Sequence, residues 1–180
     1  MKLEQTADGS YTLYVPELDE HYHSVKGALT ESQHIFIEMG LKHSPVSEPH
    51  ILEIGLGTGL NAFLTLLSAE ETRRKVHYTG IERYPLAEET LKQLDYPRLI
   101  GKQHEEDYYA IHRAPWNTET EVSPWFTYIK LKMILPGFST RRKAAVPPFP
   151  YTISSTLMPS LPKNNPKCGN NLFSILYTRY

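Results

Sequence analysis

The sequence has little of three things: cysteine, long apolar runs and, from residue 127 onward, acidic side chains. The single cysteine, Cys168, excludes an internal disulfide and a zinc site built from several cysteines. No apolar run approaches the roughly 20 residues of a membrane-spanning helix, and the first residues, MKLEQTADGS, have no hydrophobic signal region. We therefore expect a cytoplasmic protein that makes no contact with a membrane.

Charge is divided unevenly along the 180 residues, although the net charge is only −1. Residues 1–126 hold all 20 acidic residues and 11 lysines and arginines, a net charge of −9. Residues 127–180 hold 8 lysines and arginines, no acidic residue and 7 of the 14 prolines, a net charge of +8. An acidic body does not favour broad nucleic-acid binding, so any RNA contact there would need a local patch.

The most informative stretch is ILEIGLGTGLN, residues 51–61. Its start is typical of a buried strand, and the apolar run 60–67 has the length of a helix. Between them, Gly55, Gly57 and Gly59 permit backbone angles that a Cβ disfavours, and they let a ligand approach the main chain. The first N–H groups of the helix lack helical partners and attract electron-rich ligand atoms. The stretch therefore predicts a nucleotide-type site.

A second predicted strand, residues 76–81, ends in Glu82, whose carboxylate can accept hydrogen bonds from both ribose hydroxyls. The glycines are spaced G-x-G-x-G, whereas a dinucleotide-binding turn has the spacing G-x-G-x-x-G. The shorter spacing is usual in class I methyltransferases that bind S-adenosylmethionine. An acidic residue at the next strand end suits either cofactor, so an NAD-dependent oxidoreductase is an alternative.

Three segments together resemble the methyltransferase domain of the MnmC/MnmD family: the turn EIGLGTGLN (53–61), the strand end IERYPL (81–86) and the upstream segment DEHYHSVKGALTES (19–32). The resemblance covers residues 1 to about 126. It implies an S-adenosylmethionine-dependent enzyme that methylates the aminomethyl group on the wobble uridine of tRNA, giving 5-methylaminomethyl-2-thiouridine. By resemblance, the cofactor would be held by Glu53, Gly55, Gly57, Gly59, Asn61 and Glu82.

The resemblance also indicates what this chain does not supply. In bifunctional relatives an FAD-dependent oxidase domain follows the methyltransferase, and we expect it to be absent here. The family carries an acidic loop, D-A-F-x-P, after its fourth strand, and no residue of this sequence occupies it, so no catalytic residue is assigned. We expect no metal site, because His21 and His23, which share a face of a predicted strand, lack a third ligand.

Strands and helices alternate through residues 1–126, which predicts an α/β, Rossmann-like class I methyltransferase fold with a doubly wound, mostly parallel sheet. Asp8-Gly9 predicts a hairpin turn before a strand at 11–15. A helix at 28–39 is expected to stop at Gly40 and to carry Ile35, Phe36 and Met39 together on one apolar face. Further helices are predicted from Pro85 to about residue 94, ended by Tyr96-Pro97, and at 105–111.

Residues 127–180 do not continue this pattern, because prolines forbid long helices and central strands over most of the segment. A basic, disordered RNA-binding tail would suit the charge, yet the segment holds more apolar residues than most disordered tails. We expect the C-terminal strands of the fold to be missing or scrambled.

A one-base shift of reading frame gives another account of this segment. When the third base of each codon is read with the first two bases of the next, residues 157–169 permit the peptide DAFAPEKQPEMW. Within it, Met158-Pro159 forces the first Ala. The permitted peptide resembles the family's D-A-F-x-P loop, which is followed by P-E-x-W. We therefore predict that residues 1–126 are the N-terminal part of the methyltransferase domain. Residues 127–180 would be out of frame and irregular, which would leave this copy impaired.

A non-catalytic nucleotide-binding or RNA-binding fragment is the alternative outside enzymology. Tyr22, Tyr108 and Tyr109 are candidates for stacking on RNA bases, although buried or half-buried tyrosines are the more common case. Equilibrium binding separates these hypotheses: S-adenosylmethionine bound more tightly than NAD favours the methyltransferase. Binding without methyl transfer to tRNA favours the fragment.

Overall fold

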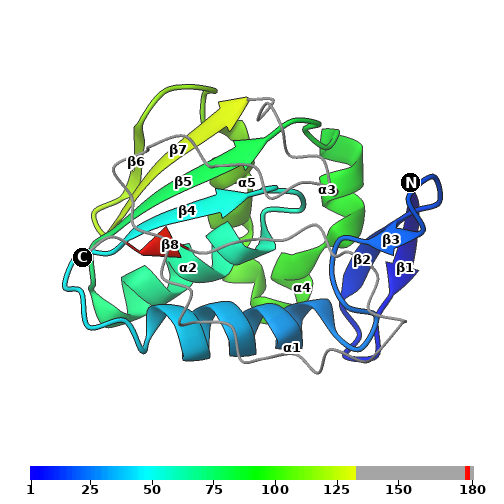
Figure 1. Cartoon of the computed structure of the whole chain (residues 1–180), viewed down its shortest axis with the longest axis horizontal. Coiled ribbons are helices and arrows are strands. Elements are labelled where there is room, and N and C mark those ends of the chain that lie inside the picture. Colours follow the sequence, from blue (N-terminus) through cyan, green and yellow to red (C-terminus); the bar gives the residue numbers. More distant parts are fainter. Residues whose placement is uncertain (133–176, 179–180) are drawn as a thin grey trace, which may run out of the picture.

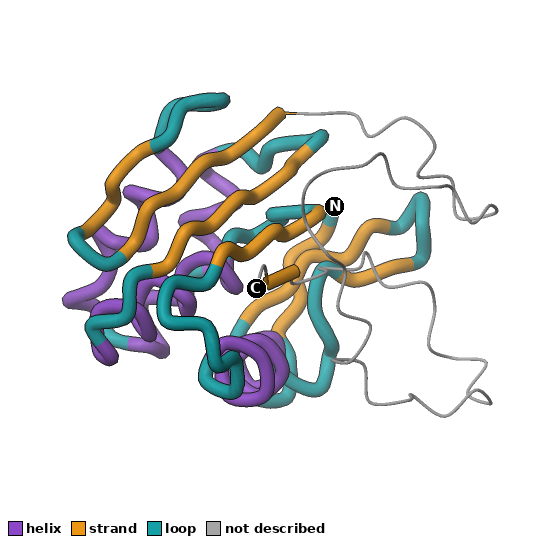
Figure 2. Tube along the Cα trace, turned by 60° about the vertical axis from the view of Figure 1, so that its left-hand side comes forward, coloured by secondary structure: helices purple, strands orange, loops and turns teal. Residues whose placement is uncertain are grey.

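The structure is a computed structural model that describes residues 1–132 and 177–178 (Figures 1 and 2). A small sheet contains β1 (Lys2–Gln5), β2 (Tyr11–Val15) and β3 (Glu20–His21). A large sheet contains β4 (His50–Ile54), β5 (Val76–Glu82), β6 (Thr120–Ser123), β7 (Phe126–Lys132) and β8 (Tyr177–Thr178). The helices are α1 (Ala28–Ser32), η1 (Gln33–Leu41), α2 (Leu60–Thr72), α3 (Glu88–Leu94), α4 (Tyr96–Ile100), η2 (Lys102–His104) and α5 (Glu105–Arg113). Among these described helices, none has the length and apolar character to cross a bilayer.

The large sheet has the strand order β6-β7-β5-β4-β8. Its centre is parallel, since β5 pairs in parallel with both β4 and β7, while β6 and β8 add antiparallel edges. Helix α2 connects β4 to β5 and packs on β5 and β7. This arrangement confirms the predicted Rossmann-like α/β fold with a mostly parallel centre.

Aromatic side chains fill the core between the large sheet and its helices. Tyr78 on β5 lies 5.8 Å from Phe126 and 6.1 Å from Tyr128, both on β7, measured between ring centroids. Phe63 of α2 lies 5.2 Å from Tyr108 of α5, and all five rings are at most 1% exposed. Burying a side chain of this size contributes on the order of 2–3 kcal/mol, so this layer fixes the sheet against α2 and α5.

The first helix differs from the predicted one in the face that it buries. It continues as the π-helix η1 and ends at Leu41, past the predicted stop at Gly40. The buried residues are Ala28, Ser32, Ile37 and Leu41. Ile35 and Met39 are 47% and 45% exposed, and Phe36 is only half-buried, so the predicted apolar face was wrong. The reason is the i→i+5 bonding of a π-helix, which adds about one residue per turn and moves the buried stripe along the sequence.

Two proline positions also differ from expectation. Helix α3 begins at Glu88 after an extended Ala87, so Pro85 precedes the helix and is not in its first turn. Pro97 does not end a helix, because it lies in the first turn of α4, where a missing N–H costs nothing. The predicted helix at 105–111 is confirmed as α5, which extends to Arg113.

Strand β7 crosses the boundary that the sequence analysis places at residue 126. It pairs with β5 in continuous register from Val76↔Phe126 to Glu82↔Lys132. The expectation of irregular chain was therefore wrong for residues 127–132, because TYIKLK alternates β-forming side chains that suit a central strand. Residues 133–176, including the segment whose shifted frame permits DAFAPEKQPEMW, lie outside the described residues.

The N-terminal hairpin forms as predicted, with Gly9 in the left-handed region at φ 82°. The Asp8 carboxylate accepts hydrogen bonds from Ser10, Thr6 and Thr30, and Thr30 lies in α1. Burial raises the pKa of Asp8, but these hydrogen bonds outweigh it and hold the pKa well below its usual value. Asp8 therefore joins the small sheet to the start of the first helix.

Candidate cofactor site

The glycine turn has the strand–turn–helix context that the sequence predicts. Gly55, Gly57 and Gly59 all have positive φ, at 85°, 54° and 72°, a region that residues with a Cβ rarely adopt. The N–H groups of Gly55 and Leu56 donate to the Ile81 carbonyl at 2.8 and 3.1 Å. The turn is therefore fixed to the end of β5 before α2 begins.

The space around the three glycines differs from one to the next. A Cβ on Gly55 would meet no atom within 4 Å, so the turn is open there. A Cβ on Gly57 would lie 2.8 Å from Cδ1 of Tyr22, and one on Gly59 would lie 2.7 Å from the ring of His112. The Tyr22 ring therefore packs against the turn at Gly57, and the His112 ring packs against it at Gly59.

Glu82, at the end of β5, reaches back to the turn. Its Oε2 accepts a hydrogen bond from the Gly57 N–H at 2.8 Å. Its Oε1 accepts from the N–H groups of Arg83 and Tyr84, both at 2.7 Å. A carboxylate has about four acceptor positions, so one position on Oε2 is available to a ligand in this conformation. Accepting both ribose hydroxyls would require Oε1 to release one of its N–H donors.

Glu53 and Asn61 lie beneath the turn. Glu53 is 1% exposed, and its two oxygens accept hydrogen bonds from Asn61 Nδ2 and the Tyr78 hydroxyl, both at 2.8 Å. Burial, together with the Glu53 charge, raises the pKa of Tyr78 well above its usual value. The structure thus brings the predicted residues together in two layers: Gly55, Gly57 and Glu82 are partly exposed, while Gly59, Glu53 and Asn61 are buried.

The segment that follows β3 contacts the glycine turn through a side-chain hydrogen bond. His23 Nε2 lies 2.8 Å from the Thr58 hydroxyl, and the Thr58 carbonyl accepts a hydrogen bond from Tyr108 at 3.0 Å. Burial lowers the pKa of His23 to about 4, so the ring is neutral at neutral pH. His21 instead lies 2.8 Å from Glu4, so the two histidines do not converge. Among the described residues, no group of three or more His, Cys, Asp or Glu could hold a metal ion.

Sequence reasoning missed how α5 contributes to this site. Tyr108 is 0% exposed and bonds to Thr58, so it cannot stack on a base. His112, four residues later on the same helix face, was not singled out, although that spacing from Tyr108 is the signal that could have found it. Burial, followed by the charge of Lys130, lowers the pKa of His112 to about 4.

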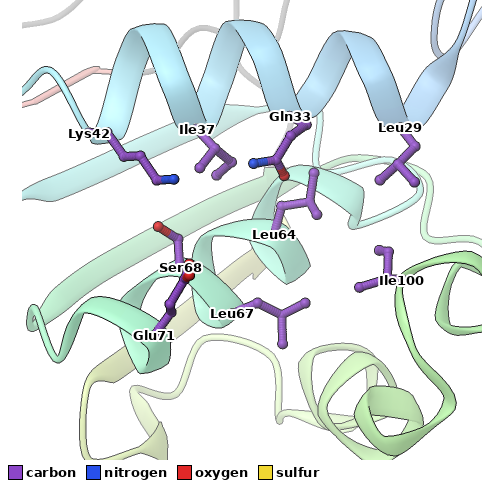
Figure 3. Close-up of a pocket in the computed structure, with 9 residues that line it drawn as sticks. All are labelled: Leu29, Gln33, Ile37, Lys42, Leu64, Leu67, Ser68, Glu71 and Ile100. Atoms are coloured by element: carbon purple, nitrogen blue, oxygen red, sulfur yellow. The ribbon is translucent and has the colours of Figure 1, made fainter.

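A pocket away from the glycine turn lies between the first helix and α2 (Figure 3). It has a volume of about 240 Å3, and its lining is mainly apolar: Leu29, Ile37, Leu64, Leu67 and Ile100, with Gln33, Lys42, Ser68 and Glu71. None of the predicted site residues lines it. The glycine turn is therefore the candidate site.

Comparisons with known proteins agree with the turn and its surroundings. No family model matches the sequence. The chain is 34% identical over 94 residues to the tRNA 5-methylaminomethyl-2-thiouridine biosynthesis bifunctional protein MnmC of Magnetococcus marinus, a match that covers 48% of this chain and 14% of that protein. It is 31% identical over 109 residues to the protein of the same name from Pseudomonas entomophila, covering 53% and 17%.

The fold agrees as well. The crystal structure of MnmC2 from Aquifex aeolicus matches with a TM-score of 0.52 and 25% identity, over 72% of this chain and 41% of that chain. The chain has an MnmC-like sequence and fold. This confirms the resemblance carried by the turn, the strand end and the upstream segment. The MnmC-like chain spans only a small part of the curated relatives, 14% of the protein from Magnetococcus marinus.

Proposed function

We propose that this MnmC-like chain is the cofactor-binding half of an S-adenosylmethionine-dependent tRNA methyltransferase. The observation that carries the proposal is the G-x-G-x-G turn, with three positive φ values and Glu82 bonded to Gly57, in a chain whose relatives are MnmC proteins. Its substrate would be the aminomethyl group on the wobble uridine of tRNA, and its location would be the cytoplasm.

The residues present suit this cofactor. The open main chain at Gly55 would receive it, Gly57 would contact it, and the available acceptor on Glu82 would bind a ribose hydroxyl. Glu53 and Asn61 would hold the turn from below without touching the cofactor. When bound, S-adenosylmethionine supplies an activated methyl group for in-line transfer to a neutral amine. The chain's contribution is to place that methyl group.

We also propose that this copy is impaired in the transfer step. The acidic loop that could orient the amine is permitted only in the shifted frame of residues 157–169. In the shifted frame, the codons of residues 127–133 permit LHKIED, which is also amphipathic, so a strand at 127–132 is compatible with either frame. The nucleotide sequence after the Phe126 codon tests this directly. Restoring the frame should give tRNA methylation that the present chain lacks, whereas equal methylation by both would refute the impairment.

Substituting one glycine tests the cofactor proposal. Gly57→Ala places a methyl group against Tyr22 at φ 54°, so we expect S-adenosylmethionine affinity, measured by calorimetric titration, to fall by about tenfold or more. Gly9→Ala is the matched control, because Gly9 also has positive φ but faces open space in the hairpin turn. Equal affinity of the two variants would contradict the proposal, and tighter binding of NAD would favour the oxidoreductase.

A further inference from the structure

Tyr22 stands at the edge of the open part of the turn. It follows β3, and the two ring atoms nearest the Cβ position of Gly57 are Cδ1 at 2.8 Å and Cε1 at 3.0 Å. Both atoms belong to one edge of the ring, so the ring rests on the turn by that edge. Tyr22 is only half-buried, so part of the residue is accessible to solvent.

The Tyr22 ring packs in part against the hydrophobic core, but hydrogen bonding of its hydroxyl does not account for this position. The described contact of the hydroxyl is with Met1 Sδ at 3.8 Å, and a thioether sulfur is a weak acceptor. Burial, and after it the charge of Glu82, raises the pKa of Tyr22, so the phenol is neutral and lies within the field of that carboxylate. The open main chain at Gly55 is therefore bordered by a carboxylate and by an aromatic ring, whose faces carry negative potential.

That environment favours a positive charge on the ligand. S-adenosylmethionine carries a sulfonium cation, whereas its product, S-adenosylhomocysteine, is a neutral thioether. In the transfer the amine lone pair forms the new N–CH3 bond, the S–CH3 bond breaks with its electrons going to sulfur, and the positive charge passes to the amine. A ring face beside the sulfur would therefore attract the donor and not the product.

We propose that Tyr22 determines specificity at this site, with its ring face attracting the sulfonium of the methyl donor so that the donor binds in preference to the demethylated product. This inference rests on the proposed function. It assigns to the N-terminal segment a role in selecting the donor over the demethylated product, a role that the glycine turn and Glu82 do not supply by geometry alone.

The test compares two dissociation constants on the full chain. S-adenosylmethionine and S-adenosylhomocysteine are titrated into the wild type, Tyr22→Leu, Tyr22→Phe and Tyr14→Leu. Tyr14 is the matched control, because it lies on the same small sheet and its hydroxyl donates to Asp19. We expect the preference for the donor to fall about three- to tenfold in Tyr22→Leu, and to change less than about twofold in Tyr22→Phe and Tyr14→Leu.

The outcomes separate the two proposals. If both ligands bind and Tyr22→Leu keeps the wild-type preference, the role of Tyr22 is refuted while the proposed function stands. Equal losses in Tyr22→Phe and Tyr22→Leu would assign the effect to the hydroxyl and also refute it. Binding of neither ligand to the wild type would refute the proposed function itself. A series of fluorinated phenylalanines at position 22 keeps the ring shape, and the preference should fall as fluorination weakens the attraction for cations.

Discussion

The large sheet and the small N-terminal sheet meet at the glycine turn, and they act on it through different interactions. The large sheet contributes main-chain hydrogen bonds from the Ile81 carbonyl and the Glu82 carboxylate bonded to Gly57. The segment after the small sheet contributes side chains, with the Tyr22 ring against Gly57 and His23 bonded to Thr58. The difference indicates that the large sheet sets the backbone conformation of the turn, while side chains of the N-terminal segment pack against it.

The two sheets also differ in what stabilises them. The large sheet is fixed by buried rings and by the buried carboxylate of Glu53. The small sheet has Leu13 as its fully buried apolar residue among the strands, and it depends on the hydrogen bonds around Asp8. Regions held by few buried apolar contacts open at lower free energy, so we expect the small sheet to open before the large one.

The largest effect is expected from Glu53→Ala. This change leaves the Tyr78 hydroxyl and Asn61 Nδ2 without their acceptor in a buried site, at a cost of about 3 kcal/mol in the free energy of unfolding. Urea unfolding followed by circular dichroism measures it. Glu48→Ala, at an exposed residue just before β4, is the control and should change stability by less than about 0.5 kcal/mol. Equal stability of the two variants would contradict the expectation that the buried Glu53 carboxylate stabilises the large sheet.

A smaller and local effect is expected from Asp8→Asn. Its amide nitrogen would replace one oxygen and face either the donors of Ser10 and Thr6 or those of Thr30, and we expect a loss of about 2 kcal/mol. Hydrogen exchange should quicken in the small sheet and α1 while the large sheet stays protected. Asp19→Asn is the matched control, because Asp19 is exposed and its carboxylate accepts a hydrogen bond only from Tyr14 among the described residues. Uniform acceleration across both sheets would contradict the separation of the two regions.

The effect that is smallest at neutral pH concerns the protonation of two buried histidines at the junction of the two regions. The pKa values of His23 and His112 are lowered from 6.5 to about 4, chiefly by burial. Between these two values the unfolded chain binds protons that the folded chain does not, so stability is full above pH 6.5 and falls toward pH 4. By linkage, the lowering of each pKa from 6.5 to about 4 corresponds to at most about 3 kcal/mol of stability per histidine, lost only on acidification.

Replacing one histidine isolates its share of the pH dependence. His23→Gln should flatten the decline in unfolding free energy on acidification, because glutamine takes up no proton. His34→Gln, at an exposed position on η1, should leave the decline as in the wild type. An unchanged slope in His23→Gln would show that His23 is not held neutral against the turn.

The parts of the fold that sequence predicted well are those that depend on neighbouring residues. Glycine spacing gave the turn, alternation gave β5, and Asp8-Gly9 gave the hairpin, because each depends on local backbone preference. The π-helix was missed because its hydrogen-bond register is set by how Ile37 and Leu41 pack in the folded molecule. The extension of β7 past residue 126 was missed because pairing with β5 outweighed the apparent break in composition.

Of the candidate site, only the glycine turn and the adjoining strand end could be predicted from the sequence. The glycines and Glu82 follow from two consecutive strands, and their role in cofactor binding is still a prediction. Its walls come from distant segments, since His23 is 35 residues from Thr58 and Tyr108 is 50 residues from it. A single sequence gives no sign of which side chains meet over such separations. The pairing of Tyr22 with Gly57 is of the same kind.

The most direct test of the account is a calorimetric titration of S-adenosylmethionine and NAD into the wild-type chain and into Glu82→Ala. We expect the wild type to bind S-adenosylmethionine more tightly than NAD. We expect Glu82→Ala to weaken S-adenosylmethionine binding by about tenfold or more, because both the ribose acceptor and the hydrogen bond to Gly57 are lost. Equal affinity for the two cofactors, or unchanged S-adenosylmethionine affinity in Glu82→Ala, would contradict it.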